Sequence, residues 1–261
     1  MNDQSYRFEG LDNFRDFGGY AVADGRRIKR GRLFRSAHLH RATDPDLAKL
    51  RELGIEAIVD LRLPGERLAQ PTRHSLQLSN QVIASDKGQP HAQSGWTQFV
   101  HRPGGFTAAD MREWMREWYR AAPFEEQHIE LFTRYLASLP ETTAPVLIHC
   151  AAGKDRTGLL AALTHHLLGV ASEHIEHDYL LTNNEAVASR FLPILRQSIV
   201  QASGRAPDPE ALRASIWIEA EYLHASFNAI TARFGSIGAY LDEGLGVGAN
   251  QQAAIRECLL E

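Results

Sequence analysis

Cysteine is scarce in this sequence, and long apolar runs are absent. The 261 residues include two cysteines, Cys150 and Cys258, too few for a disulfide-stapled scaffold or a zinc site built from cysteines. No apolar stretch approaches the roughly 18 to 20 residues that a membrane-spanning helix needs, and the start, MNDQSYRFEG, lacks the apolar core of a signal peptide. We therefore expect no stable membrane insertion, a cytoplasmic location, and Cys150 as a free and reactive thiol.

A strong charge of either sign is missing as well. Lys and Arg total 28 and Asp and Glu total 32, a formal net charge of -4, which leaves no broad basic field for nucleic acid or an anionic membrane surface. None of the 12 histidines has a metal-binding spacing such as H-E-x-x-H. A chain this long buries enough surface to fold without a metal or a disulfide. The sequence thus predicts a globular protein without metal or cofactor and without a nucleic acid partner, and it leaves the oligomeric state unknown.

Helical and strand patterns alternate in the first 150 residues, which is typical of an α/β layer. The stretch 44–54 has helical leucine spacing and ends at a glycine, directly before an apolar stretch over 55–61 that predicts a buried strand. A helix over 124–139 leads into the wholly apolar run 146–148, which is short and follows a proline, as central parallel strands do. Three further elements are predicted: extended chain with a hairpin over 1–40, a short strand over 81–86 and a long loop over 86–105.

The remainder of the chain is helical in pattern. The predicted helices cover 159–168, 172–181, 185–201 and 209–234, with a last pair over 236–260. No internal repeat or low-complexity tract divides the chain. We therefore predict one domain over 1–261, an α/β fold with a central, mostly parallel sheet flanked by helices and with a helical C-terminal half.

The segment VLIHCAAGKDRTG, residues 146–158, carries the clearest chemical signal. It places Cys150 at the carboxyl end of a buried strand and Arg156 at the start of a helix, and open α/β sheets bind ligands at that edge. Backbone N–H groups of the loop can cradle a tetrahedral oxyanion, helped by the positive end of the helix. The predicted cradle comprises Ala151, Ala152, Gly153, Lys154, Asp155, Arg156 and Thr157.

These residue types suit two-step phosphoryl transfer. A free thiol with a pKa of about 8.5 is mostly protonated at neutral pH, but the N–H groups and Arg156 favour the thiolate of Cys150, which then acts as a nucleophile. The guanidinium of Arg156 can hold two phosphoryl oxygens at once and keep that hold as charge shifts in the transition state. Thr157 is placed to donate a hydrogen bond to the sulfur and make it a better leaving group. The chemistry implied is attack on phosphorus, followed by hydrolysis of a phosphocysteine.

The same stretch matches the H-C-x5-R-[ST] signature of cysteine-dependent phosphatases, and its G-K-D-R-T centre resembles phosphoinositide phosphatases and the bacterial tyrosine/lipid phosphatases of atypical sequence. Other segments resemble that bacterial family in the same order: NFRDFGGY at 13–20, GRLFRSAHL at 31–39, VDLRLPGE at 59–66, DYLLTN at 178–183 and FGSIGAYLDEGLGV at 234–247. The resemblance covers most of the chain. It implies a protein-tyrosine-phosphatase-like fold and a metal-free phosphatase. Its substrates and partners would be phosphoproteins, with phosphotyrosine or phosphoserine/threonine, or phosphoinositides.

The leaving oxygen needs a proton, and the W-P-D sequence that usually carries the acid in tyrosine phosphatases is absent here. The two candidates are Asp155, inside the cradle, and Asp86, on the loop after the strand at 81–86. Resemblance to the G-K-D-R-T group favours Asp155, whose alternative role is to pair with Lys154 or to cap the helix. Lys154, at the mouth of the cradle, is a candidate to meet further phosphates on the substrate.

One helix has two interpretations. A capping box at Thr107 and Asp110 opens it, and Pro123 follows its end. Its apolar residues form one stripe, which is typical of a helix packed on the core: Met111, Trp114, Met115 and Trp118. Breaks at 103–105 and at Pro123 also let the segment swing as a unit, so 104–122 is alternatively a mobile helical lid over the cradle.

Two other functions stay open at this point. A sulfurtransferase of the rhodanese type also holds a cysteine in a strand-loop-helix cradle, although the present loop is one residue longer than is typical there. A phosphate-binding module without catalysis would account for the missing W-P-D acid. Hydrolysis of an aryl phosphate separates both from a phosphatase.

We expect structural rather than catalytic roles for several charged or titratable residues near the motif. Neighbours in a strand point to opposite faces, so His149 is expected to bond the loop backbone rather than to act as a base for the cysteine. Two motifs, NFRDFGGY and VDLRLPGE, contain charged pairs that we expect either to support the cradle or to pair with each other: Arg15 with Asp16, and Arg62 with Glu66.

Overall fold

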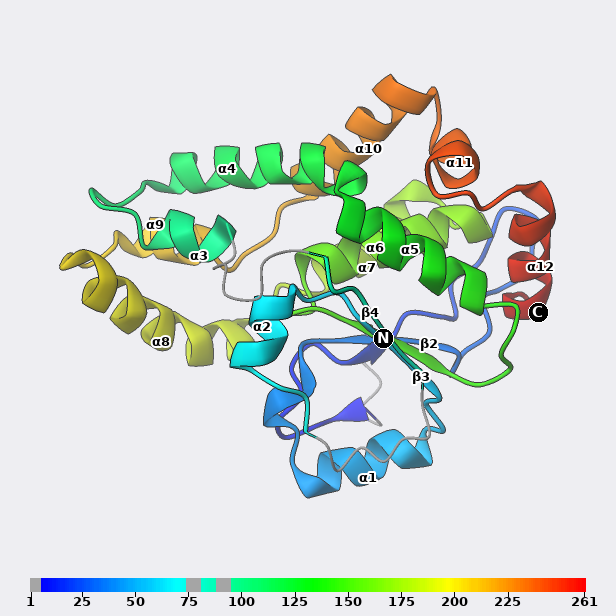
Figure 1. Cartoon of the computed structure of the whole chain (residues 1–261), viewed down its shortest axis with the longest axis horizontal. Helices are drawn as coiled ribbons and strands as arrows, with labels where there is room; N and C mark the ends of the chain where they lie inside the picture. Colours follow the sequence, from blue (N-terminus) through cyan, green and yellow to red (C-terminus); the bar gives the residue numbers. More distant parts are fainter. Residues whose placement is uncertain (1–5, 74–80, 88–94) are drawn as a thin grey trace.

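The computed structural model describes residues 6–73, 81–87 and 95–261 (Figure 1). At its centre is a five-stranded sheet with the order β1-β2-β5-β3-β4. The strands are β1 (Arg15–Asp16), β2 (Leu33–Ser36), β3 (Ala57–Asp60), β4 (Gln81–Ala84) and β5 (Val146–His149). β1 is antiparallel to β2, whereas β2, β5, β3 and β4 run parallel. The predicted mostly parallel sheet is confirmed.

Strand β5 occupies the middle of the sheet because both of its faces can be buried. All four of its residues are buried, as expected for a strand of a parallel sheet covered on both sides. Leu147 pairs in register with Phe34 of β2 and Ile58 of β3. The carboxyl end of β5 leads directly to Cys150, so the sheet order places this residue at the edge where α/β sheets bind ligands.

Helices cover the sheet and extend beyond it (Figure 1). The described helices are α1 (Asp44–Glu52), α2 (Pro64–Ala69), α3 (Gly95–Val100), α4 (Ala108–Ala121), α5 (Glu126–Ser138), α6 (Asp155–Leu168), α7 (Ser172–Leu180), α8 (Glu185–Ser203), α9 (Pro209–Ala214), α10 (Ala220–Phe234), α11 (Ile237–Ala239) and α12 (Ala249–Leu259). Short helical segments η2 (Leu39–Arg41), η3 (Ala122–Phe124) and η4 (Tyr240–Gly244) join some of them. Helices α3, α4, α8 and α9 lie together to one side of the sheet, at the left of Figure 1.

Two hydrophobic clusters form the core, one on each face of the sheet. Residues adjacent in a strand point to opposite faces, and the strands divide accordingly. The strand side chains that pack with α1 are Phe34, Ile58 and Leu147. Their strand neighbours pack with α5 and α6 in the larger cluster: Leu33, Val59 and Ile148. The larger cluster continues into α4 and α10, so the helical layer shares one core with the sheet.

The prediction of a loop over 86–105 is wrong at 95–100, whereas 101–105 are not helical. Residues Gly95–Val100 form helix α3, while 88–94 lie outside the described residues. A helix of 6 residues is too short to be stable alone. Trp96 packs against the core, and its indole Nε1–H donates to the Ser215 carbonyl at 3.3 Å. The helix therefore depends on tertiary contacts that its composition does not reveal.

The single helix predicted over 209–234 is also wrong, because the chain breaks at 215–219 between α9 and α10. The side-chain amide of Asn183 donates to the Ile218 carbonyl at 2.8 Å and accepts from the Ile218 N–H at 2.9 Å. Both backbone groups are thereby withdrawn from a helical ladder. Asn183 lies 35 residues away in sequence, beyond the reach of periodicity.

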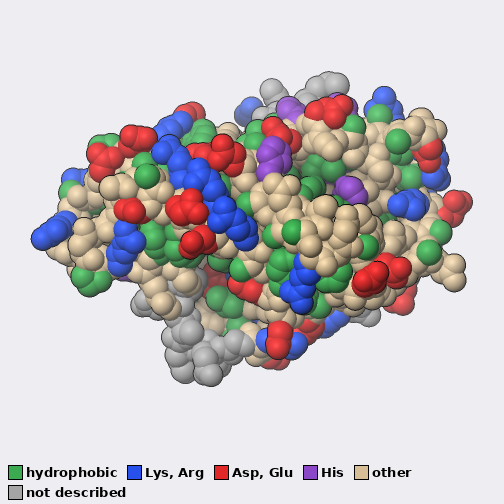
Figure 2. Space-filling model, turned by 90° about the horizontal axis from the view of Figure 1, so that it is seen from above, with side chains coloured by type: hydrophobic (Ala, Val, Ile, Leu, Met, Phe, Trp, Pro, Cys, Tyr) green, Lys and Arg blue, Asp and Glu red, His purple; other side chains and the backbone are tan. Residues whose placement is uncertain are grey.

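Charges of both signs are interspersed on the face shown in Figure 2. Between α4 and α10, Arg112 pairs with Glu219 at 2.8 Å and Arg116 pairs with Glu221 at 3.2 Å. Within the part of the chain that the structure describes, no helix is long and apolar enough to cross a membrane.

Candidate active site

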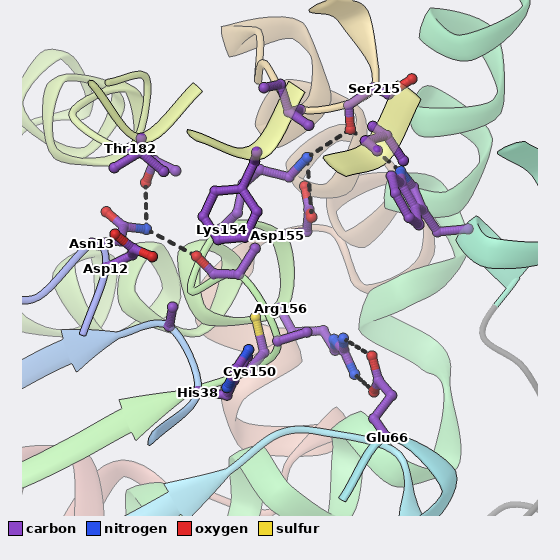
Figure 3. Close-up of a pocket in the computed structure, with 18 of the residues that line it drawn as sticks. Asp12, Asn13, His38, Glu66, Cys150, Lys154, Asp155, Arg156, Thr182 and Ser215 are labelled. Atoms are coloured by element: carbon purple, nitrogen blue, oxygen red, sulfur yellow. Dashed lines mark hydrogen bonds and ion pairs between the residues drawn. The ribbon is translucent and has the colours of Figure 1, made fainter. Parts of the chain in front are cut away.

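The segment predicted to carry the chemistry forms a strand, a tight loop and a helix. β5 ends at His149, Cys150 and residues 151–154 follow, and α6 begins at Asp155. Cys150 is 2% exposed and borders a cavity of about 480 Å³. Asp155 and Arg156 border the same cavity (Figure 3). The fold thus brings together the three residues predicted to be catalytic.

The loop directs its carbonyl groups toward the protein. The Ala151 carbonyl accepts from the His38 N–H at 3.1 Å. The Gly153 carbonyl accepts from the Arg35 guanidinium at 3.1 Å. Among the described residues, the N–H groups of 151–156 have no acceptor. Free N–H groups in a turn that opens a helix are typical of an oxyanion site, so this geometry agrees with the predicted cradle.

A buried ion-pair network supports the loop from behind. Arg35 is fully buried and pairs with Asp178 at 2.7 Å, and Arg15 pairs with the same carboxylate at 3.1 Å. Burial alone would raise the pKa of Asp178, but the two arginines hold it well below its usual range. A buried charge without a partner is costly. The network therefore keeps Arg35 in place against the loop.

Glu66 holds the guanidinium of Arg156 by two hydrogen bonds. Nη1 donates to Oε2 at 2.5 Å, and Nη2 donates to Oε1 at 2.8 Å. Burial opposes ionisation of Glu66, but Arg156 lowers the pKa of this carboxyl below its ordinary value. Burial likewise opposes the charge of Arg156, and Glu66 raises the pKa of the guanidinium. Of the two interpretations of Glu66, support of the cradle agrees with this geometry, since Arg62 pairs with Asp60 instead, at 2.7 Å.

Asp155 has a partner on each carboxyl oxygen. The Lys154 ammonium lies 3.7 Å from Oδ2 and donates to the Ser215 carbonyl at 3.4 Å. Oδ1 accepts a hydrogen bond from the Tyr119 hydroxyl at 3.0 Å. The pairing with Lys154 agrees with the alternative role predicted for Asp155. Ser215 and Tyr119 were missed, because no local pattern marks either of them.

Several residues named from the sequence do not border the cavity, among them Gly153 of the predicted cradle. The Asp86 side chain is fully exposed and pairs with Arg67 at 2.8 Å. The Thr157 hydroxyl is buried without a hydrogen-bond partner among the described residues, so the predicted bond to the sulfur is not made. His149 Nδ1 lies 3.3 Å from the Cys150 carbonyl, which agrees with the structural role predicted for this histidine.

Apolar side chains form much of the cavity wall. The 4 tryptophans of the sequence all border it: Trp96, Trp114, Trp118 and Trp217. The predicted stripe on α4 is therefore shared between the core, where Met111 and Met115 are buried, and the cavity. Helix α4 itself packs along α9 and α10.

Known proteins that are similar in sequence to this chain are named as phosphatases. The chain is 33% identical to "Putative tyrosine-protein phosphatase H16_A0669" of Cupriavidus necator, over 94% of this chain and 85% of that protein. It is 30% identical to the triple specificity protein phosphatase PtpB of Mycobacterium tuberculosis, over 89% of this chain and 91% of that protein. A tyrosine-protein phosphatase of Nostoc commune is 31% identical over 57% of this chain and 47% of that protein.

A family model described as "Tyrosine phosphatase family" matches residues 6–261. The match therefore includes the sheet, the cradle and the helical layer rather than the signature loop alone. The matched family and the similar proteins are named as phosphatases, not as sulfurtransferases or phosphate-binding modules. Because the family match spans nearly the whole sequence and two relatives align over most of their length, the chain belongs to the tyrosine phosphatase family, and it is a cysteine-dependent phosphatase.

Proposed function

We propose that Cys150 is the nucleophile, that Arg156 and the N–H groups of 151–156 bind the phosphoryl group, and that Asp155 transfers the proton. In the first step the sulfur bonds to phosphorus, the bond from phosphorus to the leaving oxygen breaks, and Asp155 protonates that oxygen. In the second step water attacks phosphorus, the sulfur–phosphorus bond breaks, and Asp155 accepts a proton from the water. The observation that carries the proposal is that these three side chains border one cavity beside N–H groups that have no acceptor in the described part of the chain.

The position of Asp155 supports it as the acid over Asp86. A general acid must lie within hydrogen-bond reach of the oxygen that it protonates. Asp155 borders the cavity one residue before Arg156, whereas Asp86 is exposed and outside it. For Asp86 to act, its loop would have to move toward the cradle and release Arg67.

We propose phosphotyrosine in a protein as the main substrate. Cys150 is buried behind a cavity whose wall includes four tryptophans, and a phenyl ring is long and flat enough to stack on such a wall while its phosphate enters the cradle. Phosphoserine and phosphothreonine are shorter and aliphatic, so they make less of this contact. We expect the enzyme to hydrolyse them more slowly.

A phosphoinositide is the second candidate substrate. Lys154 borders the cavity close to the cradle, and its ammonium would meet a further phosphate once it leaves the Ser215 carbonyl. The apolar wall would accommodate part of an acyl chain. A panel of phosphotyrosine, phosphoserine and phosphothreonine peptides and of inositol lipids, ranked by kcat/KM, decides between the candidates.

We propose that the enzyme acts in the cytoplasm. Cys150 and Cys258 are both free, and cytoplasmic reductants keep thiols reduced. The proposed nucleophile would stay in its reactive form in that compartment.

Substitution of the two cysteines tests the nucleophile. Cys150→Ser removes the thiolate but leaves Arg156 and the N–H groups, so we expect turnover of an aryl phosphate to be abolished while vanadate still binds. Cys258→Ser, the matched control, changes a cysteine outside the cavity and should retain full activity. Hydrolysis by Cys150→Ser at more than a trace of the original rate would rule out the assignment.

Substitution of the two aspartates tests the acid. Asp155→Asn should slow substrates with basic leaving groups by about 10²- to 10⁴-fold, the usual contribution of general acid catalysis, and activated aryl phosphates much less. Asp86→Asn should leave the whole series unchanged. A graded loss in Asp86→Asn, with a uniform loss in Asp155→Asn, would transfer the role to Asp86.

A further inference from the structure

Two buried tyrosines form a hydrogen-bond chain that ends at Asp155. The Tyr119 hydroxyl donates to Asp155 Oδ1 at 3.0 Å, and the Tyr179 hydroxyl donates to the Tyr119 oxygen at 2.7 Å. Tyr119 belongs to α4 and Tyr179 to α7, and Asp155 is the first residue of α6. The chain therefore links the proposed acid to two helices that the cradle motif does not include.

The donors determine the direction of these hydrogen bonds. A phenol has one hydrogen to donate, and because Tyr119 accepts the hydrogen of Tyr179, its own hydrogen goes to Asp155. Burial raises the pKa of both tyrosines well above the ordinary value, so both keep their protons. Oδ1 of Asp155 consequently receives a hydrogen bond in either protonation state. The transferable proton of the carboxyl group is then carried by Oδ2, the oxygen that lies 3.7 Å from the Lys154 ammonium.

We propose that Tyr119 is a positioning residue for proton transfer, holding Asp155 so that Oδ2 delivers the proton to the leaving oxygen. The inference rests on the proposed role of Asp155 as the general acid. After the proton has left, the same hydroxyl bonds to a carboxylate, and hydrogen bonds to charged groups are stronger than those to neutral ones. Tyr119 thus both orients the acid and stabilises the form that the first step produces.

The packing around Tyr119 leaves its ring little freedom. The ring is fully buried and stacks on Tyr222, with centroids 5.7 Å apart and an interplanar angle of 27°. Its backbone carbonyl accepts from the Ser226 hydroxyl at 2.5 Å. A ring held in this way can fix the orientation of Asp155, because small displacements of a catalytic group are costly to the rate.

Gly158 sets the position of the second tyrosine. A Cβ at this residue would lie 2.9 Å from Cδ2 of Tyr179, closer than such atoms approach in proteins. The glycine that ends the G-K-D-R-T-G stretch therefore lets the ring of Tyr179 lie directly against α6. The motif therefore provides the proposed acid, Asp155, and also the space for the two hydrogen-bonded tyrosines that orient Asp155.

A leaving-group series with Tyr119→Phe tests the inference. The variant keeps the ring and removes only the hydroxyl. For phenyl phosphate, whose phenol has a pKa of about 10, we expect kcat/KM to fall about tenfold through kcat, a part of the general-acid contribution. For 4-nitrophenyl phosphate, whose leaving group departs with little help from an acid, we expect a loss below about twofold.

Tyr222→Phe is the matched control. Its ring is the neighbour of Tyr119, and its hydroxyl is buried without a hydrogen-bond partner among the described residues, so its loss should change no substrate selectively. Tyr179→Phe is a second test that does not remove the bond to Asp155. It should give the same graded pattern with a smaller loss, about threefold for phenyl phosphate, since one bond of a chain strengthens the next.

The outcomes separate this inference from the proposed function. A graded loss in both Asp155→Asn and Tyr119→Phe, without a further loss in the double variant, supports it. A graded loss in Asp155→Asn with uniform effects in Tyr119→Phe and Tyr179→Phe overturns the inference and leaves Asp155 as the acid. If Tyr119→Phe does not fold, Tyr179→Phe decides by the same criterion. A uniform effect in Asp155→Asn overturns the proposed acid itself.

Discussion

At the scale of single residues, partner side chains hold the proposed reacting groups in place. The long side chain of an arginine loses up to about 2 kcal/mol of conformational entropy when it is ordered. Glu66 already orders Arg156 through two hydrogen bonds, so the guanidinium is in place for the phosphoryl group that we propose it binds. Tyr119 stands in the same relation to Asp155.

Substitution of Glu66 tests this ordering. Gln keeps the size of the side chain but loses the charge and one acceptor, so at most one of the two bonds to Arg156 persists. We expect kcat/KM for an aryl phosphate to fall about 10- to 100-fold in Glu66→Gln, as for other misplaced catalytic groups. Glu113→Gln, a control in an exposed pair with Arg116 at 2.8 Å, should change the rate less than twofold, in line with the small effect of surface pairs. Equal rates in both variants would contradict the ordering role.

At the scale of elements, the cradle loop lies directly on the end of strand β2. Gly153 has a φ of 65°, in the left-handed region that favours glycine. A Cβ at this position would lie 2.3 Å from the Ser36 carbonyl oxygen and 2.6 Å from the Ala37 nitrogen. Because both of these are backbone atoms, neither clash can be relieved by a side-chain rotation.

Gly153→Ala should therefore displace the loop. Gly246 offers a matched control, because its φ is also 65° but nothing lies within 4 Å of an added Cβ. We expect Gly246→Ala to lose about 1–2 kcal/mol of unfolding free energy, the cost of a left-handed backbone, and to stay active. Gly153→Ala should lose more stability and also vanadate inhibition, measured by urea unfolding and by titration. Similar losses in both variants would show that the close approach to Ser36 is unimportant.

The apolar stripe of helix α4 has two predicted roles: α4 is either a helix fixed on the core or a mobile lid. Met111 and Tyr119 are fully buried on it, whereas Trp114 and Trp118 are partly buried beside the cavity. The burial of Met111 and Tyr119 favours a helix that is fixed on the core. The positions of the two tryptophans agree with either role.

Deletion of 104–122 distinguishes the two. We expect the protein with a short Gly/Ser bridge in place of this segment to be insoluble or unfolded, since the buried side chains of α4 leave the core with it. Circular dichroism and thermal melting measure this. A soluble, folded deletion protein whose Cys150 is oxidised faster by peroxide would establish a mobile lid instead.

At the scale of the whole molecule, the cavity is assembled from segments distant in sequence. Helix α8 is tied to the N-terminal segment by an ion pair between Arg190 and Asp12. The guanidinium of Arg41 lies 5.3 Å from the centroid of the Phe191 ring. The tryptophans of the wall come from α3, α4 and the break between α9 and α10. A ligand in the cavity should therefore contact or displace side chains from all of these segments.

Tryptophan fluorescence provides a measurement of that occupation. Every tryptophan of the chain borders the cavity, so binding of phenyl phosphate to Cys150→Ser should alter the emission spectrum. Inorganic phosphate, which fills the cradle without a ring, should alter it less. Calorimetric binding of phenyl phosphate with an unchanged spectrum would show that the ring does not reach the tryptophans.

Much of the site was predictable because its central residues are neighbours in the chain. A strand, a loop and a helix in succession place Cys150, Asp155 and Arg156 together whatever surrounds them. The apolar run of β5 and the alternation of elements were enough to predict a mostly parallel sheet. Helix α3 and the break at 215–219 were not predictable, since contacts with Ser215 and Asn183 determine them.

The sequence by itself determined the chemistry that we propose for this protein: a nucleophile, a guanidinium that binds two oxygen atoms and a series of backbone N–H groups, all within one short segment. Only the tertiary structure decided which partners orient that chemistry. Glu66 lies 90 residues from Arg156 and Tyr119 lies 36 residues from Asp155, and local periodicity extends over a few residues only. Hydrogen bonds across such separations depend on how sheet and helices pack, because a side chain finds its partner only after the elements that carry both have met.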